Sequence, residues 1–284
     1  MSDVASSIAG EGPKDTSKTV RIAGDEFQMD GSEDDVYFGN LQAFIEGSWK
    51  LERYIKSHLQ KDAVCLDIGA NIGTTTLMLA KHCPDGHVYA FDADPKNIAY
   101  LRTNIARNGL TNCTVVEMAI GDKPGTLQFH AKGAHGQMMS EAHPYRDAWP
   151  SISVEVATID DFARDFRRLD FIKMDIEGSE PLALAGARET IAKFTPTIFM
   201  EFNSWCLSLL RFDPMTFSRS LWSTFDVLSV DETGQLSPVA DGDPIRFVHD
   251  NMALNGCVDD IILKPRLAVP SIEAMTQSGP LHLK

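Results

Sequence analysis

Lys173, Asp175, Glu177 and Glu180 lie close together in the segment FIKMDIEGSE, residues 171–180. Carboxylates gathered in this way can hold a divalent metal ion, accept a proton from a substrate as a general base, or clamp a polar cofactor. They can also form the acidic start of a helix, because the N-terminal end of the helix dipole favours negative charge. The choice between these roles depends on the elements that position the segment.

The overall composition narrows the classes of protein that the chain can represent. It has 284 residues, of which 43% are hydrophobic and 23% are charged, and a formal net charge of −14. The excess of acidic residues disfavours nucleic acid as the main partner, because binding to phosphates requires a concentration of Lys and Arg. The sequence has no run of about 18 apolar residues, so no membrane span is predicted.

The five cysteines are scattered along the chain and form no C-x-x-C pair. Several lie within apolar runs, which favours reduced thiols in the core over a zinc site or a disulfide framework. The N-terminal segment lacks the apolar core of a signal peptide. Together these features predict a cytoplasmic protein.

Short apolar runs alternate with helical patterns along most of the chain. Strands are expected at residues 63–70, 86–94, 112–122, 169–175 and 195–202, and helices at 74–83, 95–109 and 180–194 between them. Further strands are expected at 125–131, 151–160, 225–230 and 257–265. The alternation predicts an α/β fold with a doubly wound, mostly parallel, Rossmann-like sheet.

The other segments divide the chain around this sheet. We expect a flexible lead-in at residues 1–20, an N-terminal extension at 21–62, the sheet domain at 63–267 and a C-terminal tail at 268–284. Apolar residues at helical spacing predict an amphipathic helix over 40–60 in the extension. The sheet domain contains an inserted β-hairpin, whose loop at 131–150 suits a lid or an acceptor-recognition surface; the alternative is a solvated loop with a few anchoring side chains.

A glycine loop follows the first strand of the sheet domain, in the segment LDIGANIG, residues 66–73. Gly69 and Gly73 allow a tight turn and a close approach of the backbone to a ligand. Asp67 at the strand end can accept hydrogen bonds from an ammonium group or from loop amides. The G-x-x-x-G spacing differs from the G-x-G-x-x-G of dinucleotide sites, which disfavours NAD, and the loop also lacks the G-K-[ST] of a P-loop.

Asp92 ends the second strand of the sheet domain, about 20 residues beyond the glycine loop. In an α/β fold, an acidic residue at this distance binds the two hydroxyls of a ribose. Asp92 and Asp94 also precede Pro95, so a role at the start of the next helix is the alternative.

In the order and spacing of its motifs, the chain resembles the FkbM-type S-adenosylmethionine-dependent methyltransferases over about residues 63–202. The resemblance rests on the segments LDIGANIG, VYAFDADPKNIAYLRTNIARNG, MAIGD, FIKMDIEGSEPLALAGA and PTIFMEF. One departure is Phe91-Asp92-Ala93, where the family often has F-E-P, and the aspartate keeps the carboxylate on a shorter arm. The resemblance implies a class I methyltransferase fold with S-adenosylmethionine bound above the strand ends.

The resemblance also implies which residues bind this cofactor. Asp92 would hold the ribose, and Asp175 would lie beside the reacting methyl group. The other cofactor residues would line the methionine end, at Asp67, Gly69, Ala70, Asn71 and Gly73, and would flank the adenine, at Met118, Ala119 and Ile120.

Catalytic roles follow from the chemistry of methyl transfer to a hydroxyl, which is an in-line displacement that benefits from a base near the acceptor. Glu177 is the first candidate for this base or for a group that orients the acceptor, with Asp175 beside it at the strand end. Lys173 alternates with Met174 along the strand and should share the face of Asp175. Glu201, at the end of the fifth strand, should face the same edge of the sheet.

Glu180 has a different expected role, because it directly precedes Pro181 at a predicted helix start. Three acids without a companion cluster support a metal site only weakly, so no metal is predicted. We predict an S-adenosylmethionine-dependent methyltransferase that acts on a hydroxyl of a sugar or a secondary metabolite, so the partner is a small-molecule or glycan acceptor. The alternatives are a nicotinamide-dependent oxidoreductase on a related sheet and a non-catalytic module that binds S-adenosylmethionine.

Overall fold

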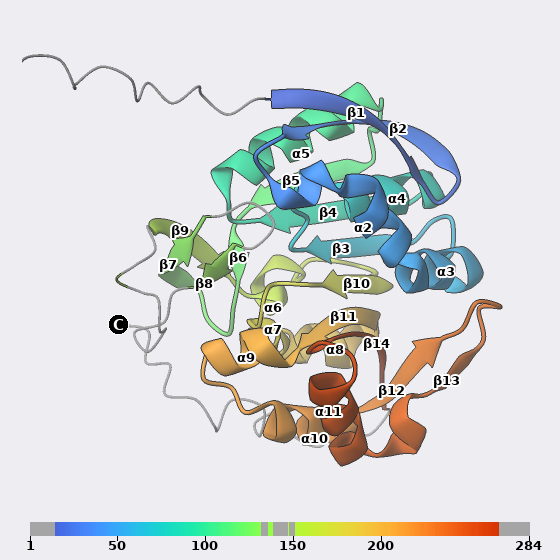
Figure 1. Ribbon diagram of the computed structural model, residues 1–284, viewed down its shortest axis with the longest axis vertical. Helices are drawn as coiled ribbons and strands as arrows, with labels where there is room; N and C mark the ends of the chain where they lie inside the picture. The colour runs from blue at the N-terminus through green and yellow to red at the C-terminus, as the bar shows by residue number, and fades with distance from the viewer. Residues whose placement is uncertain (1–14, 132–135, 139–146, 148–150, 267–284) are drawn as a thin grey trace, which may run out of the picture.

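The protein is described by a computed structural model over residues 15–131, 136–138, 147 and 151–266. Within these residues, a central eight-stranded sheet has the strand order β13-β12-β14-β11-β10-β3-β4-β5 (Figure 1). Its strands are β3 (Val64–Ile68), β4 (His87–Asp92), β5 (Cys113–Glu117), β10 (Phe171–Met174), β11 (Thr197–Asn203), β12 (Phe225–Val230), β13 (Leu236–Pro238) and β14 (Val258–Pro265). The pairings from β11 to β5 are parallel, and those from β11 to β13 are antiparallel, which confirms the predicted α/β fold.

The chain builds this sheet outward from β3 in two directions. β3, β4 and β5 follow one another toward one edge, and the chain then returns to place β10 and β11 on the other side of β3. The strand order therefore reverses between β3 and β10. In open α/β sheets, ligands bind at this position, outside the carboxyl ends of the strands.

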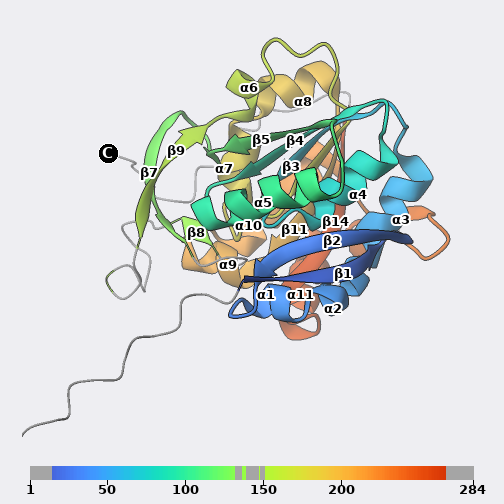
Figure 2. The ribbon, with the colours of Figure 1, turned by 90° about the horizontal axis from the view of Figure 1, so that it is seen from above.

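Helices cover both faces of the sheet. They are α1 (Val36–Gly39), α2 (Leu41–Gly47), α3 (Trp49–His58), α4 (Thr74–His82), α5 (Pro95–Arg107), α6 (Ile159–Phe162), α7 (Glu180–Ala185), α8 (Arg188–Phe194), α9 (Ser204–Leu209), α10 (Pro214–Thr224) and α11 (Pro244–Ala253). Figure 2 shows α6 and α8 on one side of the sheet and α4 and α5 on the other. In the described part of the chain, no helix is long and apolar enough to cross a membrane.

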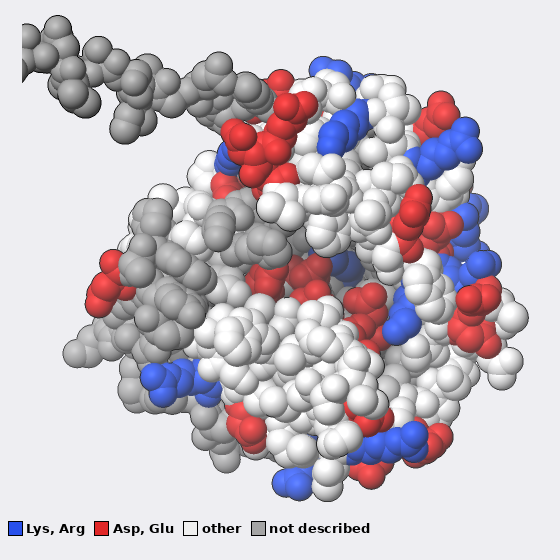
Figure 3. Space-filling model, in the orientation of Figure 1, with Lys and Arg blue, Asp and Glu red and all other residues white. Residues whose placement is uncertain are grey.

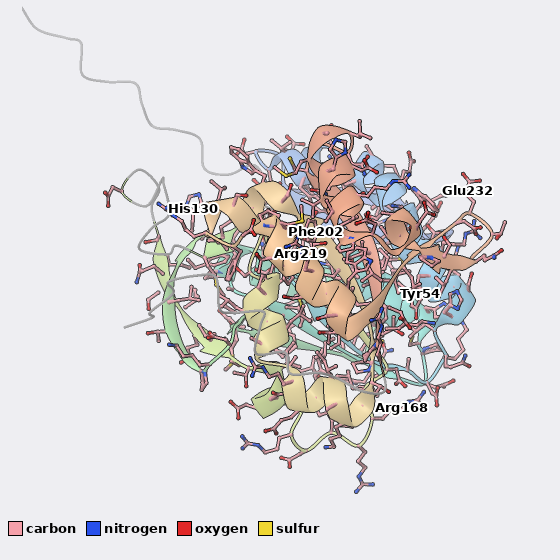
Figure 4. The ribbon with its side chains drawn as sticks, turned by 90° about the horizontal axis from the view of Figure 1, so that it is seen from below. Tyr54, His130, Arg168, Phe202, Arg219 and Glu232 are labelled. Atoms are coloured by element: carbon pink, nitrogen blue, oxygen red, sulfur yellow. The ribbon has the colours of Figure 1, made fainter. Side chains whose placement is uncertain are left out.

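The alternation of side chains along the strands divides the apolar interior into two cores. On one face lies Phe202 of β11 (labelled in Figure 4). It packs against Phe217 of α10 and Phe247 of α11, with ring centroids 5.9 and 4.9 Å apart. On the other face, Tyr54 of α3 stacks on Phe171 of β10 with ring centroids 5.6 Å apart. The sheet is therefore buried on both sides, as its near-continuous apolar strands require.

Asp-Pro pairs start three of the longer helices. Asp94 precedes α5, Asp213 precedes α10 and Asp243 precedes α11, and each carboxylate accepts a hydrogen bond from a backbone amide of the first turn. The proline that follows each aspartate stands at the first helical position, where a missing N–H costs nothing.

The N-terminal extension differs from the prediction. A β-hairpin formed by β1 (Asp15–Ile22) and β2 (Asp25–Ser32) precedes the helices, so the first strand begins inside the segment expected to be a flexible lead-in. The signal for this hairpin is present in the sequence. Buried Val20, Ile22, Phe27 and Met29 alternate with exposed residues on either side of a two-residue turn at Ala23 and Gly24, both with positive φ. This is the pattern of a tight hairpin turn.

Two helices that were expected to be continuous are each divided. The helix over 40–60 breaks at Ser48, directly after Gly47, into α2 and α3, because a Gly-Ser pair is a weak point in a helix. The helix over 180–194 breaks at Gly186, where a Cβ would lie 2.1 Å from the carbonyl oxygen of Gly121. In the second case a tertiary contact decides the break.

A four-stranded sheet with the order β6-β9-β7-β8 lies beside the central sheet. It consists of β6 (Ala119–Ile120), β7 (Gly125–His130), β8 (Gln137–Met138) and β9 (Ile152–Ala157). The strands expected at 125–131 and 151–160 are confirmed. The strand expected at 112–122 is divided, because the chain leaves the central sheet after Glu117 and Ala119 pairs with β9 instead. Most of the loop at 131–150, and the tail at 268–284, lie outside the described residues.

Candidate active site

A cavity of about 340 Å³ opens at the carboxyl ends of β3, β4, β10 and β11, where the strand order reverses. Figure 3 shows acidic side chains gathered in a hollow at the centre of one face of the molecule. Residues from four parts of the chain line the cavity. The N-terminal extension contributes Tyr37, Phe44, Ser48 and Leu51, and the segments at and after the ends of β3 and β4 contribute Gly69, Ala70, Asn71, Asp92 and Asn97. The smaller sheet and the residue before it contribute Met118, Ala119, Ile120, Phe129 and Met138, and the central sheet with the loop after β10 contributes Lys173, Asp175, Glu177, Glu201, Val258 and Asp260.

The glycine loop after β3 is held by backbone contacts on both sides. The amides of Gly69 and Ala70 donate to the carbonyl oxygen of Phe91, at 3.0 and 2.8 Å. Gly69 has a φ of 80°, and a Cβ at this position would lie 1.8 Å from the carbonyl oxygen of Asp175. Gly69, Ala70 and Asn71 all reach the cavity wall. Gly73, in contrast, packs against Leu101 and does not line the cavity.

Asp67 also lies elsewhere than expected. Its side chain is fully buried and does not line the cavity. Thr76 Oγ1 donates to Asp67 Oδ2 at 2.6 Å, and Lys173 Nζ lies 3.7 Å from Oδ1. Burial raises the pKa of Asp67, and the charge of Lys173 and the hydroxyl of Thr76 offset part of that rise. The structure therefore corrects the position of Asp67 from the cavity wall to a layer behind it.

Lys173 connects the loops that follow β3 and β10. Its Nζ donates to the carbonyl oxygen of Gly69 at 2.8 Å and lies 3.5 Å from Asp175 Oδ2, so Lys173 and Asp175 share a face as expected. The side chain is only 9% exposed. Burial opposes the charge of Lys173, but the neighbouring carboxylates of Asp175 and Asp67 raise its pKa above the usual range. Lys173 is therefore a fixed cation within an acidic site.

Asp92 projects into the cavity from the end of β4 with a fixed orientation. Its Oδ2 accepts from the amide of Asn71 and its Oδ1 from the amide of Asp94, both at 2.8 Å. Burial raises the pKa of Asp92 to about 6, against these hydrogen bonds. The cap of α5 is instead Asp94, which accepts from the amide of Lys96 at 2.8 Å. Of the two roles that the sequence left open for Asp92, the helix cap therefore belongs to Asp94.

Glu177 lies in the turn between β10 and α7, with a φ of 54°. Its Oε2 accepts a hydrogen bond from Cys206 Sγ at 3.1 Å, and the residue lines the cavity. Asp175, two positions earlier, also lines the cavity, and its side chain is 42% exposed. Both predicted carboxylates therefore reach the same space as the glycine loop.

Glu180 is the first residue of α7 and does not line the cavity. Its Oε1 reaches back to accept from the amide of Ile176 at 2.9 Å, inside the turn that carries Glu177. Burial raises the pKa of Glu180 to about 8. The expected position at the helix start is confirmed, and its carboxyl group also organises the preceding turn.

Glu201 and Asp260 are opposite each other in the antiparallel pair of β11 and β14, and both line the cavity. Burial is the main cause of a raised pKa at both residues, and the charge of Asp175 adds to it. The pKa of Glu201 is raised well above its usual range, and that of Asp260 is raised to about 6. The sequence analysis did not select Asp260. The sequence feature that could have identified Asp260 is the pair of acidic residues inside an otherwise apolar predicted strand, CVDDIILKP.

The N-terminal extension supplies a wall of the cavity that the sequence analysis also missed. Tyr37 of α1 shares a hydrogen bond of 2.7 Å with Thr74 Oγ1, at the start of α4. Burial raises the pKa of Tyr37 to about 12, so its phenol keeps its proton at neutral pH. Phe44 and Leu51 add apolar surface beside it. The only sequence signal was the amphipathic pattern of 40–60.

The residues around the cavity fit S-adenosylmethionine. A backbone loop without a side chain at Gly69 permits close approach, the oriented carboxylate of Asp92 can accept from two ribose hydroxyls, and Met118 and Ile120 offer apolar contact to an adenine. The cavity volume falls within the usual range for small-molecule sites, roughly 300–1,000 Å³. Over the described residues, no group of three or more His, Cys, Asp or Glu side chains is arranged to hold a metal ion.

Comparison with known proteins identifies relatives of this chain. The sequence profile of the methyltransferase FkbM domain matches residues 67–209. The chain is similar to the 2-O-methyltransferase NoeI of Sinorhizobium fredii, with 32% identity over 187 residues that cover 57% of this chain and 75% of that protein. It is also similar to Methyltransferase 1 of Beauveria bassiana, with 23% identity over 145 residues that cover 44% of this chain and 58% of that protein.

Among solved structures, the chain resembles the methyltransferase FkbM of Methylobacillus flagellatus KT. The two share 21% sequence identity with a TM-score of 0.44, over 74% of this chain and 46% of that chain. The present chain therefore matches less than half the length of that protein.

Proposed function

The chain belongs to the methyltransferase FkbM domain family, and from this premise we propose that it transfers a methyl group to a hydroxyl oxygen of a sugar or of another small polar metabolite. Membership of the family makes the protein an S-adenosylmethionine-dependent methyltransferase and decides against the nicotinamide-dependent oxidoreductase. The hydroxyl acceptor is supported by the similarity to a 2-O-methyltransferase.

The observation that carries the proposal is that the glycine loop, Asp92 and the turn with Glu177 all border one cavity. S-adenosylmethionine, when bound, supplies an electrophilic methyl group on a positively charged sulfur. We assign its methionine end to Gly69, Ala70 and Asn71, and its ribose to Asp92. Met118, Ala119 and Ile120 would flank the adenine. The carboxylates of the cavity favour a cationic ligand over an anionic one.

The acceptor side of the cavity has the groups that a hydroxyl acceptor needs. A hydroxyl is a weak nucleophile, and a base within hydrogen-bond reach of its proton accelerates the transfer. We assign this base to Glu177, with Asp175 and Glu201 as hydrogen-bond acceptors that orient the hydroxyls of the substrate. Lys173, whose Nζ is bound to Gly69 and lies beside two carboxylates, would keep the two loops in register rather than contact the acceptor.

The charge of the cavity favours an uncharged acceptor. Asp175, Glu177 and Asp260 line it, and Lys173 is the one Lys or Arg among the described lining residues. A phosphorylated or carboxylated acceptor would meet several carboxylates without a free cation to offset them. We also propose that the reaction takes place in the cytoplasm, because all five cysteines are free thiols.

A direct test combines binding with product detection. Calorimetry should show binding of S-adenosylhomocysteine and none of NAD, and incubation with methyl-labelled S-adenosylmethionine and a panel of neutral glycosides should yield a labelled ether, located by mass spectrometry. Label on nitrogen, carbon or sulfur of an acceptor would contradict O-methylation. Binding without product on any hydroxylated acceptor of the panel would favour the non-catalytic module.

A further inference from the structure

We infer that Cys206 is a positioning residue for Glu177, whose carboxylate it holds against the first turn of α9. The inference rests on the proposed role of Glu177 as the base. Cys206 Sγ lies 3.1 Å from Glu177 Oε2, within the range accepted for a hydrogen bond that involves sulfur. The thiol is buried, with the residue 5% exposed, and so has little water to bind instead.

The start of α9 fixes the position of this thiol. Asn203 caps the helix, and its Oδ1 accepts from the amide of Cys206 at 3.1 Å. The amide of Ser204 donates to the carbonyl oxygen of Cys257 at 2.9 Å, which anchors the same turn to the segment before β14. The sulfur therefore lies on a backbone that is held at two points.

The direction of the hydrogen bond follows from the environment of the sulfur. Burial, and next the charge of Glu177, raise the pKa of the Cys206 thiol far above its usual range, so the thiol keeps its proton and donates. Gln137 of β8, also buried, donates from Nε2 to Cys206 Sγ at 3.4 Å. Gln137 therefore donates to Cys206, and Cys206 in turn donates to Glu177.

The backbone of the turn is shaped to make this contact. Glu177 and Gly178 both have positive φ, of 54° and 93°. A Cβ on Gly178 would lie 2.5 Å from the carbonyl carbon of Cys206, so the turn can press against α9 only with glycine at that position. A positive φ at a residue with a side chain is unfavourable and persists where surrounding contacts enforce it. The thiol contact and the close packing at Gly178 are such contacts.

The hydrogen bond from Cys206 restricts the side-chain conformation of Glu177, the proposed base. A glutamate side chain has several rotamers, and catalysis requires the one within reach of the acceptor hydroxyl. A donor on Oε2 selects this rotamer. Loss of the donor should therefore lower turnover without affecting the cofactor pocket.

The test compares Cys206→Ala, which removes the donor, with Cys206→Ser, which keeps an O–H donor. Cys113→Ala is the matched control, because Cys113 is a half-buried cysteine of β5 that does not line the cavity. We expect Cys206→Ala to lower kcat by roughly tenfold. The KM for S-adenosylmethionine should stay within a factor of about two, because the change lies on the acceptor side. Cys206→Ser should recover most of the loss, and Cys113→Ala should match the wild type.

A spectroscopic measurement checks the contact independently of activity. The S–H stretching band of Cys206, obtained as the infrared difference between the wild type and Cys206→Ser, should move to higher frequency in Glu177→Gln, where the acceptor is neutral. A band that does not move would overturn the hydrogen bond. If Glu177→Gln is impaired while Cys206→Ala keeps the wild-type kcat, the positioning role is wrong. If Glu177→Gln keeps the wild-type kcat, the base of the proposed function is wrong, and the positioning role falls with it.

Discussion

Gly69 and Asp175 are in backbone contact across the crevice of the sheet, so close that a Cβ on the glycine would lie 1.8 Å from the carbonyl oxygen of the aspartate. This contact joins the loop after β3, which we assign to the cofactor, to the loop after β10, which carries the proposed base. Lys173 reinforces it by donating to the carbonyl oxygen of Gly69 at 2.8 Å. The two halves of the site therefore share one backbone support.

The first prediction tests this support with Gly69→Ala. The added methyl group meets a backbone atom that cannot move alone, and φ at Gly69 is 80°, so we expect a loss of roughly 3 kcal/mol or more in the free energy of unfolding. Gly109→Ala is the matched control, because Gly109 has a φ of 65° with nothing within 4 Å of its Cβ position. It should cost only about 1 kcal/mol. Equal losses for the two variants in denaturant unfolding would show that the contact at Asp175 is not tight.

The second prediction concerns the cofactor. Asp92→Asn keeps the shape of the side chain but replaces one acceptor oxygen by an amide, so a ribose hydroxyl loses its partner. We expect the dissociation constant for S-adenosylhomocysteine, measured by calorimetry, to rise by about tenfold. Glu117→Gln, at the end of the neighbouring strand β5 and outside the cavity, is the control and should leave the constant unchanged. An unchanged constant in Asp92→Asn would remove Asp92 from the cofactor site.

The third prediction assigns catalysis to Glu177. Glu177→Gln should lower kcat by a factor of about 10²–10⁴, the usual contribution of a general base, with cofactor binding preserved. Glu189→Gln, on the exposed first turn of α8, should behave as the wild type in the same methyl-transfer assay. If Glu177→Gln weakens cofactor binding as much as turnover, the residue binds the cofactor rather than acting as a base.

The fourth prediction is a pH dependence of stability that originates at Glu180. Burial raises its pKa to about 8, whereas the ordinary value is 4.5, so between these pH values the folded protein binds more protons than the unfolded chain. The stability contributed by the protonated carboxyl is therefore present at low pH and is lost as the pH rises through about 8. Glu180→Gln keeps the acceptor for Ile176 and cannot ionise. Its melting temperature should fall less than that of the wild type between pH 5 and 9, and parallel curves would contradict the assignment.

The fifth prediction concerns the buried pair of Lys173 and Asp67. Lys173→Met leaves Asp67 without its cation in a fully buried position, which we expect to cost roughly 3–5 kcal/mol of unfolding free energy. The double variant Lys173→Met with Asp67→Asn removes both charges and should recover much of this loss. A double-mutant cycle measured by denaturant unfolding gives the coupling. Losses that simply add would mean that the two charges do not interact.

Much of this protein is determined locally by its sequence. The apolar runs over 63–70 and 86–94 form strands because short runs of mostly apolar residues favour the interior of a parallel sheet. The glycine loop could be predicted because positive φ at Gly69 is a local requirement. Asp92 and Glu177 reach one cavity as expected, because the carboxyl ends of parallel strands meet at the same edge.

Other features depend on contacts between segments that are distant in the chain. Asp67 has the spacing of a cofactor residue, but the pleat of β3 turns its side chain behind the cavity, where Lys173 from β10 neutralises it. Asp260 reaches the site only because β14 pairs with β11, and Cys206 meets Glu177 only because α9 packs against Gly178. Sequence spacing determines which residues end a strand or start a helix. The packing of the elements decides which of those side chains share a cavity, because that depends on distances that no local pattern contains.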